Sequence, residues 1–190
     1  MSRKAAYQES LKQDILHQTL TLAGEEGWLG VSTRKIADRL NTSTTAIYHY
    51  FGGKDAILVE LQQEGFRQLC AVQLAALASR EGKPKKQLKA VSMAMLHFAM
   101  ENPERYALMF NLDGAVCNHD DESDESMAGM NQIRTVLEQL TSENVDSVLM
   151  HWFATMQGFV ALARHDCHPE QVNRFEQLVE EAINRFIKGL

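Results

Sequence analysis

Five side chains that can form hydrogen bonds are crowded into one short segment, residues 44–51. They are Thr44, Thr45, Tyr48, His49 and Tyr50. A helix over this segment offers only Ala46, Ile47 and Phe51 for burial and leaves the five polar side chains facing outward. Hydroxyl, phenol and imidazole groups can donate and accept hydrogen bonds at base edges in the major groove, and threonine methyls can contact thymine methyls. The segment therefore predicts recognition of duplex DNA.

Two short helices joined by a tight turn are expected to present this segment. A helix from Thr33 to Leu40 is indicated by the hydroxyl cap at Ser32 and by apolar residues at helical spacing. Asn41 then ends that helix, because asparagine tolerates the left-handed backbone conformation that a sharp turn requires. A second hydroxyl cap, Ser43, begins the helix that carries the polar segment. This order predicts a helix-turn-helix.

Basic and hydroxyl side chains flank the helix pair at positions suited to DNA phosphates. They are Ser32, Thr33, Arg34, Lys35, Arg39 and Lys54. Each can donate a hydrogen bond to a phosphate oxygen, and Lys54 stands at the start of a helix, where backbone N–H groups also point outward. The alternative is a purely structural helical hairpin in which Tyr48 or Tyr50 fills the core, since tyrosine is often half-buried.

The run STRKIADRLNTSTTAIYHYFGGKDAIL resembles the DNA-binding segment of the TetR family of bacterial transcriptional regulators. The shared features are an apolar helix that ends in glycine, a helix containing Ile36-Ala37, and an aromatic-rich helix that closes in Y-x-Y-F before a lysine. The resemblance covers about the first sixty residues, and beyond them the phrase NPERYALMF is similar to one in the family's regulatory domains. There are two departures. Asn41 stands where the family often has glycine, and Gly52-Gly53 replaces a proline or a polar cap.

The resemblance implies a role for each residue of the motif. It implies phosphate contacts by Thr33, Arg34, Tyr50 and Lys54. It implies base contacts by Thr44, Thr45, Tyr48 and His49. It also implies a homodimer and a small-molecule effector. Repression of transcription is the default expectation, because nothing in the sequence resembles a polymerase-contacting surface.

Composition and apolar spacing indicate an all-α protein. The chain has 190 residues, only three of them proline, and is 45% hydrophobic, which suffices for a core. We expect an N-terminal three-helix helix-turn-helix DNA-binding domain, residues 1–54, and a larger C-terminal helical ligand-binding and dimerisation domain, residues 55–190. The other expected helices cover residues 9–26, 55–79, 84–100, a segment beginning at Pro103, and residues 127–140, 143–164 and 169–188. The helix over 55–79 is expected to be the only continuous link between the domains.

Charge and cysteine content indicate where the protein works. Residues 1–54 carry a net charge of +2 and the rest −8, so only the amino-terminal part offers positive potential to DNA. No apolar run is long enough to span a membrane, and the N-terminus lacks the apolar segment of a signal peptide. Three widely spaced cysteines fit reduced thiols rather than a disulfide framework. A cytoplasmic protein is therefore expected.

The last two expected helices are apolar over more than one face. One face can pack on the protein's own domain, and the other then needs a partner. Two copies would form a four-helix interface about a two-fold axis. Such a homodimer would fix the spacing of two DNA-binding domains, so that the two halves of a near-palindromic operator are read in successive major grooves.

Methionine and aromatic residues of the C-terminal domain could line a cavity for an apolar small molecule, because methionine adapts its shape to ligands of varied outline. The predicted lining residues are Met93, His97, Met100, Tyr106, Met109, Phe110, Trp152, Met156 and Phe159. The alternative is that the same residues are ordinary core filling.

A metal- or redox-responsive regulator of the same fold is an alternative reading. His165, Cys167 and His168 are close in sequence, as are Cys117 and His119. Neither group has the spacing of a four-ligand zinc site, so no metal or other cofactor is expected.

An enzyme is not expected. The chain lacks G-x-S-x-G, H-E-x-x-H, Walker-loop and G-x-G-x-x-G motifs. Adjacent acids such as Glu25 and Glu26 do not face each other across a cleft, and we interpret them as solvated charge. A helical adaptor that binds only proteins is the remaining alternative, and the outward polar cluster counts against it.

Overall fold

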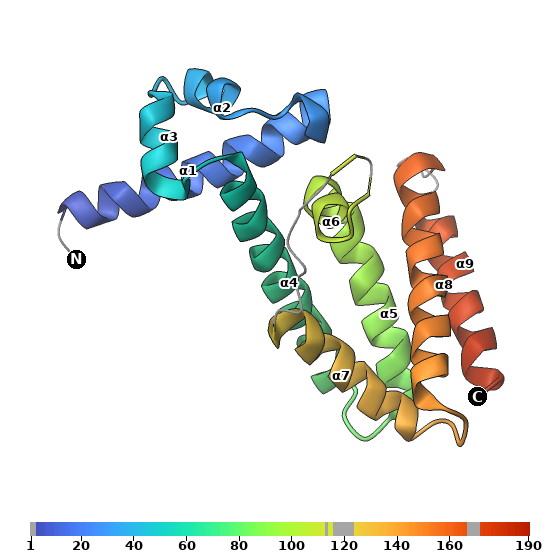
Figure 1. Cartoon of the computed structure of the whole chain (residues 1–190). Coiled ribbons are helices and arrows are strands. Elements are labelled where there is room, and N and C mark those ends of the chain that lie inside the picture. Colours follow the sequence, from blue (N-terminus) through green and yellow to red (C-terminus); the bar gives the residue numbers. More distant parts are fainter. Residues whose placement is uncertain (1–2, 113, 116–123, 167–171) are drawn as a thin grey trace. The chain divides into compact units, whose positions relative to one another are not determined.

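The computed structural model describes residues 3–112, 114–115, 124–166 and 172–190, and every regular element in these ranges is a helix (Figure 1). The elements are α1 (Arg3–Glu26), a short 3₁₀ helix (Trp28–Gly30), α2 (Thr33–Arg39), α3 (Thr44–Phe51), α4 (Lys54–Ala78), α5 (Pro84–Glu101), α6 (Pro103–Met109), α7 (Asp124–Glu138), α8 (Val145–Asp166) and α9 (Val172–Lys188). The predicted all-α fold is confirmed. In the part of the chain that the structure describes, no helix has the length and apolarity needed to cross a membrane.

Two helices begin earlier than the sequence predicts. Helix α1 starts at Arg3 rather than near Glu9, because residues 3–8 are mostly good helix formers even though they add nothing to the apolar stripe. Helix α7 starts at Asp124 rather than near Met127, and acidic residues are favourable at the positive end of a helix. Apolar spacing finds the stretch of a helix that carries an apolar stripe, but it does not mark where the helix begins.

The chain divides into two compact units. The first, which we call the head, comprises Met1–Gly65 and Glu104–Asp120, and the second, which we call the body, comprises Phe66–Pro103 and Asp121–Leu190. Helix α4 contributes to both, and α6 belongs to the head although it follows α5 of the body. The chain therefore passes between the units at the α5–α6 junction as well as within α4. The expected single link through α4 is wrong, because apolar spacing does not reveal which distant helix α6 packs against.

The head is built around one hydrophobic core that joins α1, α2, α3, α4 and α6. Ile15 of α1, Ile36 of α2 and Ile47 of α3 are fully buried in it. Helix α4 adds Ile57 and α6 adds Leu108, both also fully buried. Since α2 and α3 are too short to be stable alone, this shared core holds them.

In the body, α5 packs against α7, α8 and α9 (Figure 1). Trp152 of α8 is fully buried, and its Nε1 donates a hydrogen bond to Ser92 Oγ of α5 at 2.9 Å. The Ser92 hydroxyl in turn donates to the Leu88 carbonyl oxygen at 2.7 Å. The first bond satisfies the buried Nε1–H of Trp152 and fixes α8 against α5, and the second satisfies the donor of the Ser92 hydroxyl.

Ser92→Ala is expected to lower the free energy of unfolding by about 1–3 kcal/mol, because the buried Trp152 N–H loses its acceptor. Urea unfolding followed by tryptophan fluorescence measures the change. Ser79→Ala is the matched control, since the exposed Ser79 hydroxyl donates to the Ala76 carbonyl, and its effect should stay below about 0.5 kcal/mol. Equally small effects of both substitutions would contradict the role given to Ser92.

Candidate nucleic-acid interface

Local capping sets the ends of α2 and α3. The hydroxyls of Ser32 and Ser43 each accept a hydrogen bond from the backbone N–H three residues further on, at 3.3 and 3.2 Å. Asn41 lies between the helices with a φ of 49°, the left-handed conformation predicted for it. Helix α3 ends at Gly52, whose φ of 72° costs glycine no steric strain. The predicted bounds of α3, residues 44–51, are confirmed.

One side of α3 is anchored and the opposite side is open. Ile47 is fully buried in the head core. Thr44, Thr45 and His49 are exposed, and Tyr48 is 54% exposed. The four predicted base-contacting side chains thus share the exposed side of a helix whose other side is held in the core.

Tyr50 does not face outward as the sequence predicts. It is half-buried and packs against the head core, because it stands one helical turn after Ile47 and shares the inward side of α3. Its ring also meets His49 edge to face, with ring centroids 5.4 Å apart. A tyrosine held by its ring can still present its hydroxyl at the surface, so its phosphate contact stays a prediction.

Lys12 of α1 contacts both the end of α3 and α4. Its ammonium nitrogen lies 5.6 Å from the centre of the Phe51 ring and 3.5 Å from Glu60 Oε1. A cation over an aromatic face is attracted by the ring's electrons, and the carboxylate holds the cation in place. Phe51, the last residue of α3, therefore contacts Lys12 of α1, and Glu60 of α4 holds Lys12 in place.

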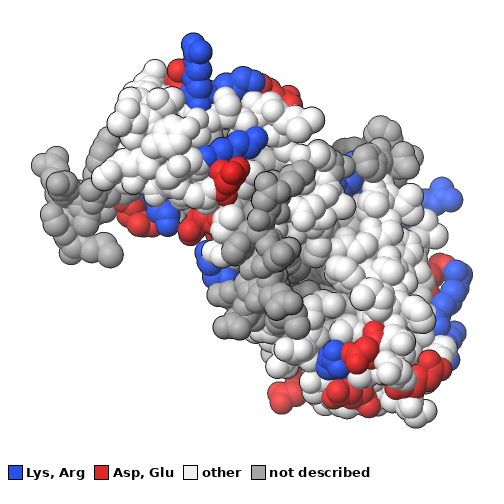
Figure 2. Space-filling view, in the orientation of Figure 1, with Lys and Arg blue, Asp and Glu red and all other residues white. Residues whose placement is uncertain are grey.

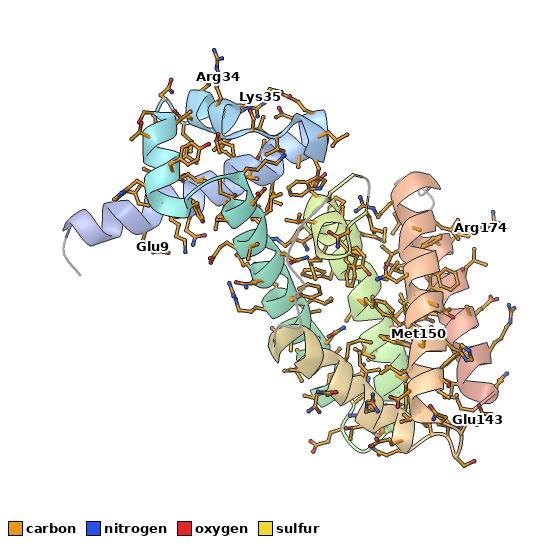
Figure 3. The ribbon with its side chains drawn as sticks, viewed as in Figure 1. Glu9, Arg34, Lys35, Glu143, Met150 and Arg174 are labelled. Carbon is orange, nitrogen blue, oxygen red and sulfur yellow. The ribbon has the colours of Figure 1, made fainter. Side chains whose placement is uncertain are left out.

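The predicted phosphate contacts differ in how freely they can move. The Arg34 side chain is 87% exposed and points away from the other helices of the head (Figure 3), and its Nε lies 4.0 Å from the Asp38 carboxylate one turn away. Thr33 is half-buried at the start of α2. The Lys54 ammonium donates to the Trp28 carbonyl oxygen at 3.4 Å. Arg34 is the most accessible of the three.

Lys35 and Arg39, also expected near phosphates, are paired with acids of α1 instead. The Lys35 ammonium lies 2.5 Å from Glu26 Oε2 and 3.0 Å from the Gly30 carbonyl oxygen. The Arg39 guanidinium donates a hydrogen bond to Glu25. That bond holds the pKa of the Glu25 carboxyl below its ordinary value and raises the pKa of Arg39. Both acids are exposed, as expected of solvated charge, but the sequence did not reveal their partners, which lie 9 and 14 residues away.

The residues predicted to line an effector cavity are divided between the two units. Tyr106, Met109 and Phe110 belong to the head, and Met93, His97, Met100, Trp152, Met156 and Phe159 belong to the body. The Trp152 Nε1–H already donates its hydrogen bond to Ser92. The exposed His97 ring places its Nε2 2.7 Å from Glu176 Oε1. The proposed cavity stays a prediction.

A surface pocket of about 380 Å³ lies in the body. Its lining residues are Arg80, Lys86, Lys89, Ala90, Met93 and Glu180. Of the predicted effector residues, this lining includes Met93. Sequence reasoning missed the rest, because Arg80 of the α4–α5 turn and the lysines of α5 look like solvated charge when the neighbouring α9 is not considered.

The alternative metal or redox site cannot be placed. Cys117, His119, Cys167 and His168 lie outside the described residues, as does the side chain of His165. Within the described ranges, no group of three or more His, Cys, Asp and Glu side chains could hold a metal ion.

Two parts of the chain match models of known families. Residues 15–61 match bacterial regulatory proteins of the tetR family. Residues 88–186 match the tetracyclin repressor-like C-terminal domain, and this match alone covers more than half of the chain.

Individual relatives agree with these models. The HTH-type transcriptional regulator BetI of Burkholderia mallei (strain NCTC 10229) is 31% identical over 91 residues, which cover 48% of this chain and 47% of that protein. The chain thus spans about half the length of the curated relatives it matches.

Solved structures show the same fold over most of the chain. The TetR family transcriptional regulator PfmR from Thermus thermophilus superposes with a TM-score of 0.69 at 21% identity, covering 93% of this chain and 98% of that one. The ketosteroid transcriptional regulator KstR2 of Mycobacterium tuberculosis gives 0.71 at 17% identity, covering 94% of this chain and 93% of that one.

Arg34→Ala is expected to weaken binding to all duplexes alike. It should also make the fall of log affinity with log salt concentration less steep, by about 0.9 in slope for each head bound. His49→Ala is expected to leave that slope unchanged and to cost about 1–3 kcal/mol of discrimination at particular base pairs. Fluorescence anisotropy over a salt series, with point-mutated duplexes, measures both. A changed base preference in Arg34→Ala would contradict its assignment to the backbone.

Proposed function

The chain belongs to the TetR family of bacterial regulatory proteins, and we propose that it is a ligand-responsive repressor that binds a palindromic operator as a homodimer. As a member of this family it is a transcriptional regulator with a helix-turn-helix DNA-binding segment. Repression, the dimer and the effector are the finer part of the proposal. The proposal includes the cytoplasmic location expected from the sequence, since a bacterial regulator acts where the DNA lies.

The observation that carries the proposal is the division of α3 into a buried and an open side. Its exposed threonines, tyrosine and histidine match the chemistry of base edges in a major groove. Its burial through Ile47 means that these groups are presented by a fixed helix rather than a mobile loop. Arg34 stands beside them as a freely accessible cation for a phosphate.

The dimer is supported by apolar side chains that the chain itself leaves uncovered on α8 and α9. Met150, labelled in Figure 3, and Leu162 of α8 are 62% and 53% exposed, and Leu178 of α9 is 50% exposed. A Cβ built on Gly158 of α8 would meet nothing within 4 Å, so this side of α8 is open to a partner helix. A second copy is the partner that would cover these residues and pair two heads at a fixed spacing.

An effector can act on the head through α6. Gly65 of α4 and Met109 of α6 lie so close that an added Cβ on Gly65 would be 2.6 Å from the Met109 sulfur. The Arg105 guanidinium of α6 lies 3.2 Å from Glu64 of α4. The rings of Tyr106 and Phe110 in the same segment contact each other at a tilt of 41°, with their centroids 4.5 Å apart. A ligand that contacts α6 would therefore shift a helix of the head's own core, with a coupling of about 1–3 kcal/mol to DNA binding.

Selection of bound sequences from random duplex DNA tests the proposed function. We expect a near-palindrome whose half-sites are about 10 base pairs apart, centre to centre, or a multiple of that spacing. Recovery of no preferred sequence at low salt would contradict sequence-specific DNA binding. Recovery of a single, unpaired half-site would contradict the proposed dimer but not sequence-specific DNA binding.

Leu162→Glu combined with Leu178→Glu is expected to give a monomer, because burying unpaired carboxylates in the interface is costly. Sedimentation velocity measures the association state, and gel shift on the palindrome should show a loss of affinity of at least about tenfold. Leu74→Glu is the matched control, since Leu74 is a 43% exposed leucine of α4, and this variant should remain a dimer. A dimeric double variant would place the interface elsewhere.

A further inference from the structure

The two faces of α2 carry cations with different surroundings. Arg34 and Asp38 occupy one face, where their side chains are 87% and 73% exposed. Lys35 and Arg39 occupy the neighbouring face, where their side chains are 47% and 32% exposed and each has an acidic partner from α1. Figure 2 shows acidic atoms beside basic ones on the visible surface of the head.

The acids stand where a helix does not favour them. Glu25 and Glu26 are the last two residues of α1, and the C-terminal end of a helix carries partial negative charge. No basic residue lies in the last turn of α1 to balance them. Their compensation comes from α2, which places Lys35 and Arg39 one turn apart, opposite the two consecutive carboxylates.

The Glu26 side chain packs closely on the backbone of the 3₁₀ helix that follows α1. A Cβ added to Gly30 would lie 2.8 Å from Glu26 Cβ and 3.2 Å from its Oε2, so glycine is needed for this close approach. The Lys35 ammonium joins the same place, because it contacts both the Glu26 carboxylate and the Gly30 carbonyl oxygen. One cation thus connects the end of α1, the following 3₁₀ helix and the first turn of α2.

We propose that Lys35 and Arg39 are positioning residues that fix α2, and with it α3, on the end of α1 through Glu26 and Glu25, and that neither cation contacts DNA phosphate. This inference deepens the proposed DNA binding and rests on it. Helix α2 packs against α3, and the backbone N–H of Thr42 bonds the Ala37 carbonyl of α2, so the orientation of α2 is passed on to α3.

The function of the pairs is orientation rather than stability. Solvent-exposed ion pairs contribute little to folding, because water screens them. A small rotation of α2 would nevertheless move Thr44, Tyr48 and His49 relative to the bases, and hydrogen bonds to base edges depend steeply on distance and angle. The pairs therefore act on the discrimination between operator and random DNA.

The salt dependence of operator binding is the first test, with anisotropy as the readout. Lys35→Gln and Arg39→Gln are expected to keep the wild-type slope of log affinity against log salt while their ratio of operator to random-duplex affinity falls. Arg34→Gln should instead make this slope less steep by about 0.9 for each head bound. The same loss of salt dependence in Lys35→Gln or Arg39→Gln would overturn the inference. A wild-type protein that binds no duplex would overturn the proposed function as well.

A charge exchange is the second test. Arg39→Glu alone should weaken operator binding by at least about tenfold, because it faces Glu25 with a like charge. Adding Glu25→Arg should restore the affinity to within about threefold of wild type, since the pair re-forms with its charges exchanged. An exchange variant that binds no better than Arg39→Glu would overturn the inference. The glutamine variants, which add no repulsion, decide the question if Arg39→Glu does not fold.

Discussion

The burial of Ile47 is the constraint on which the head depends. Helix α3 has only eight residues, and a helix of that length is not stable in water on its own. Burying one isoleucine side chain contributes about 1.5–3 kcal/mol, and the caps at Ser43 and Gly52 satisfy the two helix ends. Because burial of the inward side stabilises the helix, the outward side can consist of polar residues. These residues need not contribute to the stability of α3.

The same core contains a helix from the region that matches the C-terminal family model. Leu108 of α6 is buried with Ile47 in one cluster, although α6 lies within the region that matches the C-terminal family model. The boundary at residues 54/55 expected from the sequence follows the motif, whereas the compact units follow packing. Helix α6 lies in the sequence region that matches the C-terminal family model, but it packs in the core of the head. This packing is the basis on which the proposed effector could act through α6.

Local signals in the sequence were sufficient for the helix-turn-helix. Ser32, Asn41 and Ser43 act on backbone groups only a few residues away, so their types alone predict the two helices and the turn between them. The sequence predicts the open side of α3 for the same reason, since it follows from helical spacing around Ile47. Family resemblance added roles for individual residues, and those roles stay predictions.

Tertiary pairing was not accessible to the same reasoning. The partners of Lys35 and Arg39 are Glu26 and Glu25, which lie 9 and 14 residues away along the chain, and nothing local specifies such pairs. The sequence predicts an outward Tyr50, because tyrosine suits both water and core and its type alone does not decide between them. The methionines and aromatic residues of the effector prediction share chemistry, but composition does not tell which helix faces which. They consequently fall in both units.

The most direct test of the account is where the protein touches its DNA. Backbone amide chemical shifts of the deuterated, nitrogen-15-labelled chain can be followed by NMR during titration with the selected operator duplex. The largest shifts are expected in α3 and at the start of α2, with small shifts at the α4–α5 turn despite Arg80 and Lys83. Largest shifts at that turn, and an unchanged α3, would contradict the claim that α3 reads the groove.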